Sequence, residues 1–597
     1  MADSAADRLL LLQREMAERE IDLYVIPTSD FHGSEYIGDY FKAREYITGF
    51  SGSAGTAVVL QNEAYLWTDG RYFIQAEKQL SGSGIFLQRM DEEGVPTVEE
   101  FIREKLPRGG TLGFDGRMVS AETGENYKKA AAENEAFLSA DEDLIGGIWK
   151  DRPKMPKEPF FLLQEQYCGR SMEEKLADVR KAMETAGADV HILSSLCDIA
   201  WLLNVRGADI LHVPVVLSYL VISKEACIWF LQDDVITKEQ QAYFREHHIE
   251  IKPYEEIYAY AGTLNGRAVL CDKTKLNYKI FDSIPERAEK IQAENPTELL
   301  KAVKNPVEIK NTVYAHIKDG VAVTKFIYWL KTHIGKEEIT EASAAGYLLN
   351  KRMEQENFLD VSFDTISAYG ANAAMMHYSA DEKDCARLEP EGFLLVDSGG
   401  HYLEGTTDVT RTIVLGPVAD LMKKHYTAVL RGCLNLSAAK FLYGCSGMNL
   451  DILARQPLWN LGIDYKCGTG HGVGHVLNVH EGPNAFRWKQ RLRGEAAVLK
   501  EGMITTDEPG VYAENEYGIR IENELLCRKA EKNEYGQFMC FENITCVPID
   551  LDAVNADEMT AGEKEILNAY HKKVYETLSP YMTEKENEWL KENTRAI

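Results

Sequence analysis

The sequence predicts three domains, the first two of the α/β class and the third, larger one of the α+β class. The chain has 597 residues, and about 150 residues per domain gives three or four domains. One order of helix and apolar strands occurs twice in the first half. After residue 358, short strands with glycine-rich turns replace it. We place the domains at 1–155, 156–303 and 304–597.

The first domain begins with a helix over about 4–18, followed by the apolar strand DLYVIP and a Thr-Ser-Asp turn. A glycine-rich loop, GFSGSAG, leads into two strands, the second ending at Trp67, and into a helix that carries Arg71. This alternation of helices and strands indicates an α/β domain.

A second copy of this order follows a linker. The linker, IWKDRPKMPKEP, contains three prolines, which interrupt helices and donate no backbone hydrogen bond. Beyond it, the helix SMEEKLADVRKAMETAG precedes the strand DVHILS and further apolar segments. We therefore predict an internal duplication.

The third domain starts where Pro306 interrupts a helix. Two long amphipathic helices follow, at about 306–332 and 339–357. Short strands, a central helix pair and a helical tail at about 560–595 complete the chain, which is typical of the α+β class.

Composition restricts the function classes. Lys and Arg number 66 against 94 Asp and Glu, a net charge of −28, and 45% of residues are hydrophobic, so we expect a globular protein. The negative charge disfavours nucleic acid and membrane surfaces as partners. We expect a cytoplasmic protein, because no secretory or membrane-spanning apolar run is apparent and the eleven cysteines are scattered singly. Cys467 is predicted to be a buried structural thiol.

Two aspartates fall around a glycine-rich turn in FLLVDSGGHYLEGTTDVTRTIVL. Counting a hairpin about its tip, near Tyr402 and Leu403, places Asp397 opposite Asp408. Two carboxylates on one face repel each other unless a cation lies between them. The alternative is that each aspartate caps a turn.

A second acidic pair occurs in ITTDEPGVYAENEYGIRIENELL. Pro509 forces Glu508 into extended geometry, and counting across Asn515 makes Glu508 and Glu522 neighbours. Glutamate is seldom fully buried unless it is paired. The alternative is a solvent-facing edge strand.

Between the two pairs, GTGHGVGHVLNVHEGP places His471, His475 and His480 among small residues. One histidine with four carboxylates is the ligand set expected for two divalent ions, and it selects Mn, Co, Fe or Zn above Ca or Cu. It is too acidic for a structural zinc site.

These motifs together resemble the pita-bread metallopeptidases. The strings are DSGxxYxxGTTDVTRT, GTGHGVG, NVHEGP, TxEPGVY and GIRIEN, and the residues occur in the order Asp397, Asp408, His471, Glu508, Glu522. The strings SEYI…GFSGSAGTA, WTDGRYF and TCVPID extend the resemblance over the whole chain, to the long, three-domain, cytosolic form of the aminopeptidase P (Xaa-Pro aminopeptidase) family. The resemblance implies two creatinase-like N-terminal domains and a C-terminal pita-bread catalytic domain.

The resemblance also implies site residues. Asp397 would bind one metal, typically Mn²⁺, Asp408 and Glu522 would bridge both metals, and His471 and Glu508 would complete the second. Glu508 would also accept a proton, and a hydroxide bridging the metals would be the nucleophile. His377 and His480 would be catalytic residues that contact the substrate and the tetrahedral intermediate, and Arg71 and Arg520 would be substrate-site arginines. His475 matches no ligand position and is interpreted as a spectator.

The implied function is removal of an N-terminal residue that precedes proline in a peptide, by a homodimer in which Arg71 reaches a neighbouring protomer's site. A prolidase that cuts only Xaa-Pro dipeptides shares the ligand set but does not need two N-terminal domains. Methionine aminopeptidase lacks the first 300 residues, and histone-binding pita-bread proteins have lost ligands. In the loop before His377, Ala371 and Ala373 stand where the family usually has Pro and Gly.

Overall fold

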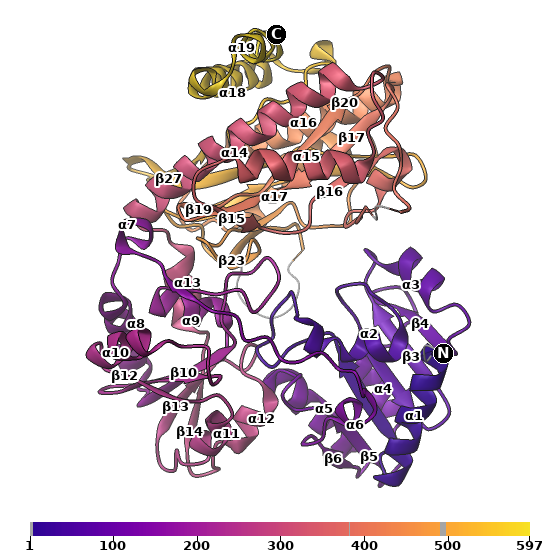
Figure 1. Cartoon of the computed structure of the whole chain (residues 1–597), viewed down its shortest axis with the longest axis vertical. Coiled ribbons are helices and arrows are strands. Elements are labelled where there is room, and N and C mark those ends of the chain that lie inside the picture. The colour runs from indigo at the N-terminus through magenta and orange to yellow at the C-terminus, as the bar shows by residue number, and fades with distance from the viewer. Residues whose placement is uncertain (1–3, 381–382, 490–496) are drawn as a thin grey trace. The chain divides into compact units, whose positions relative to one another are not determined.

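The computed structural model describes residues 4–380, 383–489 and 497–597. The chain forms two compact units, whose helices and strands are labelled in Figure 1. Unit 1 contains Met1–Leu162 and Ser171–Thr297, and unit 2 contains Leu163–Arg170 and Glu298–Ile597. The short helix α7 (Glu165–Cys168) thus packs in unit 2, against α14 (Pro306–His333), although it falls within the predicted second domain. The boundaries near 155 and 303 stay a prediction.

Unit 1 contains two six-stranded sheets with the same topology. Their strand orders are β4-β3-β2-β1-β5-β6 and β12-β11-β10-β8-β13-β14. In each sheet the first three strands along the chain pair with each other in antiparallel orientation. The remaining three pairs of neighbouring strands are parallel. The predicted duplication is therefore confirmed. The strands of the first sheet are β1 Leu23–Pro27, β2 Thr56–Leu60, β3 Ala64–Thr68, β4 Ile85–Arg89, β5 Thr111–Phe114 and β6 Phe137–Ser139. Those of the second are β8 Val190–Leu193, β10 Ser218–Ser223, β11 Cys227–Leu231, β12 Ile249–Pro253, β13 Ala268–Cys271 and β14 Glu289–Gln292.

Helices cover both faces of the first sheet. Along β1, Leu23 and Val25 enter one apolar cluster while Tyr24 and Ile26 enter another, because successive side chains of a strand point to opposite faces. A strand that is buried on both faces is apolar throughout, as DLYVIP is. The helices of the first half of unit 1 are α1 Ala5–Glu18, α2 Ala43–Thr48, α3 Phe73–Gln79, α4 Val98–Lys105, α5 Ala121–Glu133 and α6 Leu144–Ile148. Those of the second half are α8 Met172–Ala186, α9 Leu196–Leu203, α10 Lys238–Glu246, α11 Glu256–Ala261 and α12 Tyr278–Ser283. β7 (Phe161–Leu162) pairs with β9 (Val205–Arg206), and α13 spans Pro296–Ala302.

Unit 2 combines antiparallel sheets with helices, so the mixed α/β and α+β class is confirmed. Its sheet orders are β16-β17-β20, β21-β28-β27-β24-β22-β23, β15-β18-β19 and β25-β26. The helices are α14, α15 Glu341–Met353, α16 Asp420–Ser437, α17 Gly447–Trp459, α18 Ala561–Leu578 and α19 Glu584–Asn593. The first seven strands are β15 Phe358–Val361, β16 Ile366–Tyr369, β17 Phe393–Ser398, β18 Gly400–Tyr402, β19 Gly405–Thr406, β20 Val409–Val414 and β21 Lys440–Leu442. The remaining ones are β22 Gly470–Gly472, β23 Glu481–Phe486, β24 Ile504–Asp507, β25 Gly510–Ala513, β26 Tyr517–Arg520, β27 Asn523–Asn533 and β28 Gly536–Asn543.

The long helix α14 begins at a strong N-terminal cap. The Asn305 side chain accepts hydrogen bonds from the backbone N–H groups of Val307 and Glu308, at 2.9 and 3.0 Å. Pro306 occupies the first turn, where its missing N–H costs nothing. Asn305-Pro306 therefore starts the helix at the residue that the sequence predicts.

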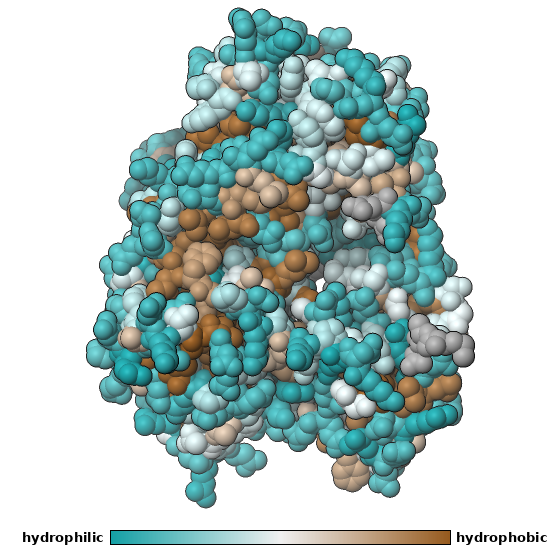
Figure 2. All heavy atoms as spheres, viewed as in Figure 1, coloured by the Kyte–Doolittle hydropathy of each residue, from teal (hydrophilic) through white to brown (hydrophobic). Residues whose placement is uncertain are grey.

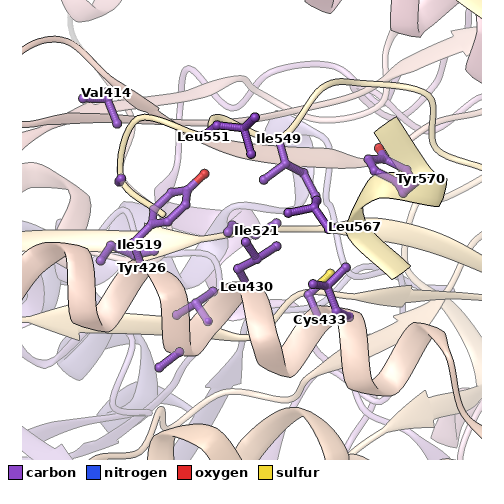
Figure 3. Packing of buried hydrophobic residues seen from close by; sticks show 14 of the residues in the cluster. Val414, Tyr426, Leu430, Cys433, Ile519, Ile521, Ile549, Leu551, Leu567 and Tyr570 are labelled. Atoms are coloured by element: carbon purple, nitrogen blue, oxygen red, sulfur yellow. The ribbon is translucent and has the colours of Figure 1, made fainter. Parts of the chain in front are cut away.

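A single apolar cluster joins helix α16, the β26 region and the C-terminal tail (Figure 3). Leu430 of α16 points toward Ile519 and Ile521, and Leu567 of α18 reaches the same cluster from the tail. Burying each such side chain contributes about 1.5–3 kcal/mol relative to exposure. The cluster thus fixes the backbone on both sides of Arg520.

The face of the molecule drawn in Figure 2 is mainly hydrophilic, in keeping with the net charge of −28. Among the described residues, no helix has both the length and the apolar content needed to cross a bilayer.

Candidate metal centre

Strands β17 and β20 position the first two carboxylates. Asp397 lies on β17, which is buried throughout, and the register places it opposite Thr410 of β20. Asp408 immediately precedes β20, and its backbone N–H donates to Oε1 of Glu524 at 2.8 Å. The predicted pairing of Asp397 with Asp408 is therefore wrong. The turn is not a simple hairpin, because β18 and β19 pair with each other in a separate sheet.

The β25–β26 hairpin positions the second pair. Gly510 pairs with Arg520, and Asn515 adopts a left-handed conformation at the turn, with φ of 61°. Extending this register by two residues places Glu508 opposite Glu522, which agrees with the counting across Asn515. Both glutamates lie two residues beyond the last pair of the hairpin, Gly510 and Arg520.

His471, on β22, directs one ring nitrogen toward the carboxylates. Its Nδ1–H donates to the carbonyl oxygen of Gly472 at 2.9 Å. Nε2 lies 3.5 Å from Oδ2 of Asp408 and 3.5 Å from Oε1 of Glu508. One ligand atom each from Asp408, His471 and Glu522 lie within 4.8 Å of one another. This spacing suits a common metal ion.

The electrostatics of the site favour bound protons or cations. Burial raises the pKa of Asp408 and, together with the charges of Asp408 and Asp397, raises that of Glu522 well above its usual range. Burial disfavours the charged form of His471, but the Asp408 hydrogen bond and the Glu508 charge outweigh it and raise its pKa to about 9. A divalent cation would replace these protons, since metal ligands bind in their deprotonated forms.

The donor atoms fit a dinuclear site. Oδ1 of Asp397 is buried and has no hydrogen-bond partner among the described residues, while Oδ2 accepts from Nη2 of Arg520 at 2.5 Å. Four carboxylates and one imidazole match the preferences of Mn²⁺ and similar divalent ions. The residues present therefore fit two such ions.

Arg520 joins the two ligand-bearing strand pairs, β17–β20 and β25–β26. Besides Asp397, its guanidinium donates to Oγ1 of Thr410 at 3.1 Å and to Oη of Tyr512 at 2.7 Å. Thr410 Oγ1 in turn donates to Oε2 of Glu522 at 2.7 Å. These contacts hold Arg520 against two carboxylates of the site, and its predicted contact with substrate stays a prediction.

Helix α17 supports the segment that precedes His471. Arg455 donates to Oδ2 of Asp451 at 2.7 Å, within a fully buried ion pair. Thr469 Oγ1 donates to the other oxygen of Asp451 at 2.5 Å. The carbonyl of Thr469 accepts the backbone N–H of Glu508 at 2.8 Å. One ion pair thus supports the backbone beside both His471 and Glu508.

Another buried arginine, Arg411, is part of β20. It donates to the backbone carbonyls of Thr410 and Glu522, at 2.8 and 2.6 Å. Its other acceptors, at 2.8 to 3.1 Å, are Pro548 O, Val547 O, Asn523 Oδ1 and Tyr570 Oη. All six acceptors are uncharged, and they tie the backbone beside Glu522 to the Val547–Pro548 segment and to α18.

The structure places the two predicted substrate histidines differently. The His480 ring lies edge to face against that of His471, with centroids 4.3 Å apart. His377 is exposed, three residues beyond the 3₁₀ turn η2 (Gly370–Ala374), and η2 packs against β26. His480 therefore adjoins the proposed metal ligands, and the role of His377 stays a prediction.

Arg71 lies in the turn before α3 rather than on the predicted helix. Its guanidinium donates to both carboxylate oxygens of Asp69, at 2.8 and 2.7 Å. This ion pair belongs to unit 1, and a substrate contact by Arg71 stays a prediction.

His475 and Cys467 have structural surroundings. His475 is buried, with Nδ1 3.1 Å from Oγ1 of Thr312 and Nε2 3.0 Å from the carbonyl of Tyr167. Burial raises the pKa of Cys467 to about 11, which keeps the thiol protonated at neutral pH. Cys467 is half-buried rather than buried as predicted, and the spectator role of His475 stays a prediction.

Sequence reasoning missed the residues that orient the proposed ligands. Thr410, Glu524 and Thr469 contact them through hydrogen bonds that span distant segments. Tyr512 acts one step further away, because it accepts a hydrogen bond from Arg520, which in turn binds Asp397. Thr410, Thr469 and Tyr512 each lie inside a quoted motif, TTDVTRT, GTGHGVG and TxEPGVY respectively, whereas Glu524 had no such local signal.

Comparisons with known proteins agree along the whole chain. A model of the creatinase/prolidase N-terminal domain matches residues 8–145, a second such model matches 151–308, the metallopeptidase family M24 model matches 311–529, and its C-terminal region matches 537–597. Aminopeptidase P2 of Arabidopsis thaliana is 38% identical over 97% of this chain and 86% of its own length. The chain belongs to the aminopeptidase P family of M24 metallopeptidases.

Two solved structures resemble this aminopeptidase P family member to different extents. The X-prolyl aminopeptidase of Caenorhabditis elegans, described as a cytosolic enzyme with a di-nuclear active site, is 32% identical. It covers 100% of both chains with a TM-score of 0.93. A Xaa-Pro dipeptidase of Bacillus anthracis is 25% identical, with a TM-score of 0.50, and covers 64% of this chain and 99% of its own. The chain thus has two creatinase-type N-terminal domains followed by an M24 catalytic domain.

Proposed function

We propose that this protein is a Xaa-Pro aminopeptidase, which removes the N-terminal residue from peptides whose second residue is proline. The main support for the proposal is that ligand atoms of Asp408, His471 and Glu522 lie within 4.8 Å of one another. They do so in a chain that matches an X-prolyl aminopeptidase over its whole length. The relative named aminopeptidase P2 supports the same activity.

In this proposal two divalent ions, of which Mn²⁺ is the proposed species, are held by five residues. Asp397 would hold one ion, His471 and Glu508 would hold the other, and Asp408 and Glu522 would serve both. When bound, the ions supply a water of lowered pKa and polarise the peptide carbonyl. The unpartnered Oδ1 of Asp397 and the raised pKa values of Asp408 and Glu522 support this assignment.

The chain's own residues orient the substrate and move a proton. Glu508 is the proposed proton acceptor, because its side chain is 21% exposed and Thr506 Oγ1 orients its Oε1 from 3.1 Å. His480 and His377 are proposed to contact the substrate and donate to the tetrahedral intermediate. Arg71 and Arg520 are the proposed substrate-site arginines.

A prolidase-type dipeptidase is the second candidate, favoured by the fold shared with the Bacillus anthracis enzyme. Nearly all of that chain aligns with only 64% of this one. The additional N-terminal domain therefore favours the aminopeptidase.

We also propose a homodimer in the cytoplasm. The relative from Caenorhabditis elegans is described as cytosolic, and the eleven cysteines are scattered singly along the chain, as expected in a reducing compartment. The dimer rests on the family resemblance and on the proposed reach of Arg71.

A peptide panel tests the activity. We expect purified, Mn²⁺-loaded protein to release the first residue from Xaa-Pro-Ala and Xaa-Pro-Pro, and to cut Xaa-Ala-Pro poorly. The Xaa-Pro bond is a tertiary amide with a fixed φ, so a site shaped around the ring loses near-attack geometry when the ring is absent. N-acetylation should block cleavage, because it removes the free amine that an acidic, metal-lined pocket binds.

Mass spectrometry of the products and kcat/KM are the measurements. Chelator should abolish turnover and added Mn²⁺ should restore it. Values for Xaa-Pro and Xaa-Ala substrates within about threefold, roughly 0.65 kcal/mol, would contradict the proposed specificity. Cleavage of Xaa-Pro dipeptides alone would favour the prolidase.

A further inference from the structure

One carboxylate closes the base of the segment that carries His377. Glu341, the first residue of α15, is fully buried. Its Oε1 accepts the backbone N–H of Tyr369 at 2.6 Å, and its Oε2 accepts that of Ala386 at 2.7 Å. Tyr369 and Ala386 lie on opposite sides of His377 in the chain. A single side chain therefore binds described backbone both before and after His377 to α15, and the segment that carries His377 is taken as residues 369–380.

Two side chains from within the segment bind the same carboxylate. Oη of Tyr378, the neighbour of His377, donates to Oε2 of Glu341 at 2.8 Å. Nδ2 of Asn372 lies 3.0 Å from Oε1 and 3.2 Å from Oε2. Among the contacts of the described residues, Glu341 has four neutral donors and no cationic partner. Because a buried carboxylate deprived of its donors is strongly unfavourable, the four donors are held to it.

The opposite side of the segment contacts the strand that ends at Arg520. The carbonyl of Ala373 lies so close to Gly518 of β26 that a Cβ there would meet it at 1.8 Å. The segment is thus fixed to α15 through Glu341 and to β26 through η2, while the His377 side chain remains exposed. A histidine that is exposed on a segment fixed from both sides is placed to meet a ligand rather than to support the core.

We infer that Glu341 is the positioning residue of His377: its buried carboxylate fixes the segment so that His377 meets the peptide substrate. The inference rests on the proposed function. Glu341 does not touch substrate, and it acts through His377. Replacing Glu341 with Gln puts an NH2 donor in place of one carboxylate oxygen. At least one of the four groups that donate to Glu341 then loses its acceptor.

A double-mutant cycle tests the inference, with Glu341→Gln, His377→Ala and the double variant assayed on Xaa-Pro-Ala with Mn²⁺. We expect Glu341→Gln to lower kcat/KM on the order of 10- to 100-fold, as displacement of a catalytic contact by about 1 Å does. In the His377→Ala background the same change should cost less than about threefold, because the contact is already absent. Bound metal, measured by mass spectrometry, should equal that of the wild type.

The matched control is Glu338→Gln, three residues earlier and exposed, which should change kcat/KM less than twofold. An equal cost of Glu341→Gln in both backgrounds, or a loss of bound metal, overturns the inference. If Glu341→Gln does not fold by circular dichroism, Tyr378→Phe takes its place in the cycle. Wild-type protein without Xaa-Pro activity refutes the proposed function, whereas an active wild type with a fully active His377→Ala variant refutes only the inference.

Discussion

Hydrogen bonds from the protein hold one oxygen of several proposed ligands. Arg520 donates to Oδ2 of Asp397, Thr410 donates to Oε2 of Glu522, and Thr506 donates to Oε1 of Glu508. Such outer partners fix the orientation of a carboxylate before a metal arrives. The site is therefore preorganised by neutral hydroxyls and one arginine.

Removing a bridging charge should disturb both metals. We expect Glu522→Gln or Asp408→Asn to lower bound metal below two ions per chain and kcat by at least about 100-fold, because each carboxylate is proposed to contact both ions. Plasma mass spectrometry and peptide turnover measure the two effects. Glu514→Gln, on the exposed turn, is the control. Two bound ions with a normal rate would refute the bridging assignment.

Metal removal should introduce a pH-dependent loss of stability. The pKa of His471 is raised to about 9 in the metal-free fold, against about 6.5 in an unfolded chain. The folded state then binds the proton more tightly, so this stabilisation is complete below about pH 6.5 and is lost as pH rises through about 9. The raised pKa values of Asp408 and Glu522 act in the same direction.

Bound metal replaces these protons, so the metal-loaded protein should not show the loss. We expect the difference in Tm between Mn²⁺-loaded and metal-free protein to widen from pH 6.5 to 9, as measured by calorimetry. A constant difference over this range would contradict the assignment of His471 as a ligand.

Among the elements, the two strand pairs that carry the acidic residues show what the sequence can predict. Asn515, which tolerates a left-handed conformation, marks the centre of the β25–β26 turn, so counting outward from it reaches the correct partners. The turn after Asp397 has its own β18–β19 pair in another sheet, and long-range pairing shifts the register from Asp408 to Thr410. Helix starts such as Asn305-Pro306 were predictable because capping is local. Glu341 was not, since its partners lie at least 28 positions away.

The cap of α14 gives a prediction for one element. Asn305→Ala removes two hydrogen bonds to helix N–H groups, and with them the bond from Nδ2 to the carbonyl of Cys168 at 2.8 Å. We expect a loss of about 1 kcal/mol or slightly more in the stability of unit 2, with kcat/KM unchanged below the melting transition. Thermal unfolding by circular dichroism measures the change.

The control for the cap is Asn460→Ala, at the exposed end of α17. An unchanged Tm in Asn305→Ala would show that the cap contributes nothing. A loss of activity at 25 °C would show that the start of α14 also supports the metal centre.

At the scale of the whole molecule, the duplicated N-terminal half raises the question of its contribution to the reaction. The two sheets share strand order and direction, yet neither contains a proposed metal ligand. Arg71 in the first copy is the proposed link to substrate. The sequence could predict the duplication from repeated patterns, but no local pattern can show which protomer's site Arg71 serves.

Mixed dimers answer that question. If Arg71 serves the partner's site, co-expression of differently tagged Arg71→Ala and Glu522→Gln chains should restore activity that neither homodimer has. In the mixed dimer, the intact metal site of one chain receives Arg71 from the other. Peptide turnover by the doubly purified species and sedimentation at micromolar concentration are the measurements. A fully active monomer, or no recovery in mixed dimers, would reject the shared site.

Arg411 forms hydrogen bonds to both family regions that make up the third domain. Two family regions meet between residues 529 and 537, which lies within the β27–β28 hairpin. The guanidinium binds the carbonyls of Thr410 and Glu522 on one side of that boundary and those of Val547 and Pro548 on the other. A chain that ended at the boundary would leave a buried cation short of acceptors beside the proposed catalytic strands. The C-terminal region therefore completes the hydrogen bonds of a buried residue of β20, and a chain cut at this boundary should lose the cooperative unfolding of unit 2.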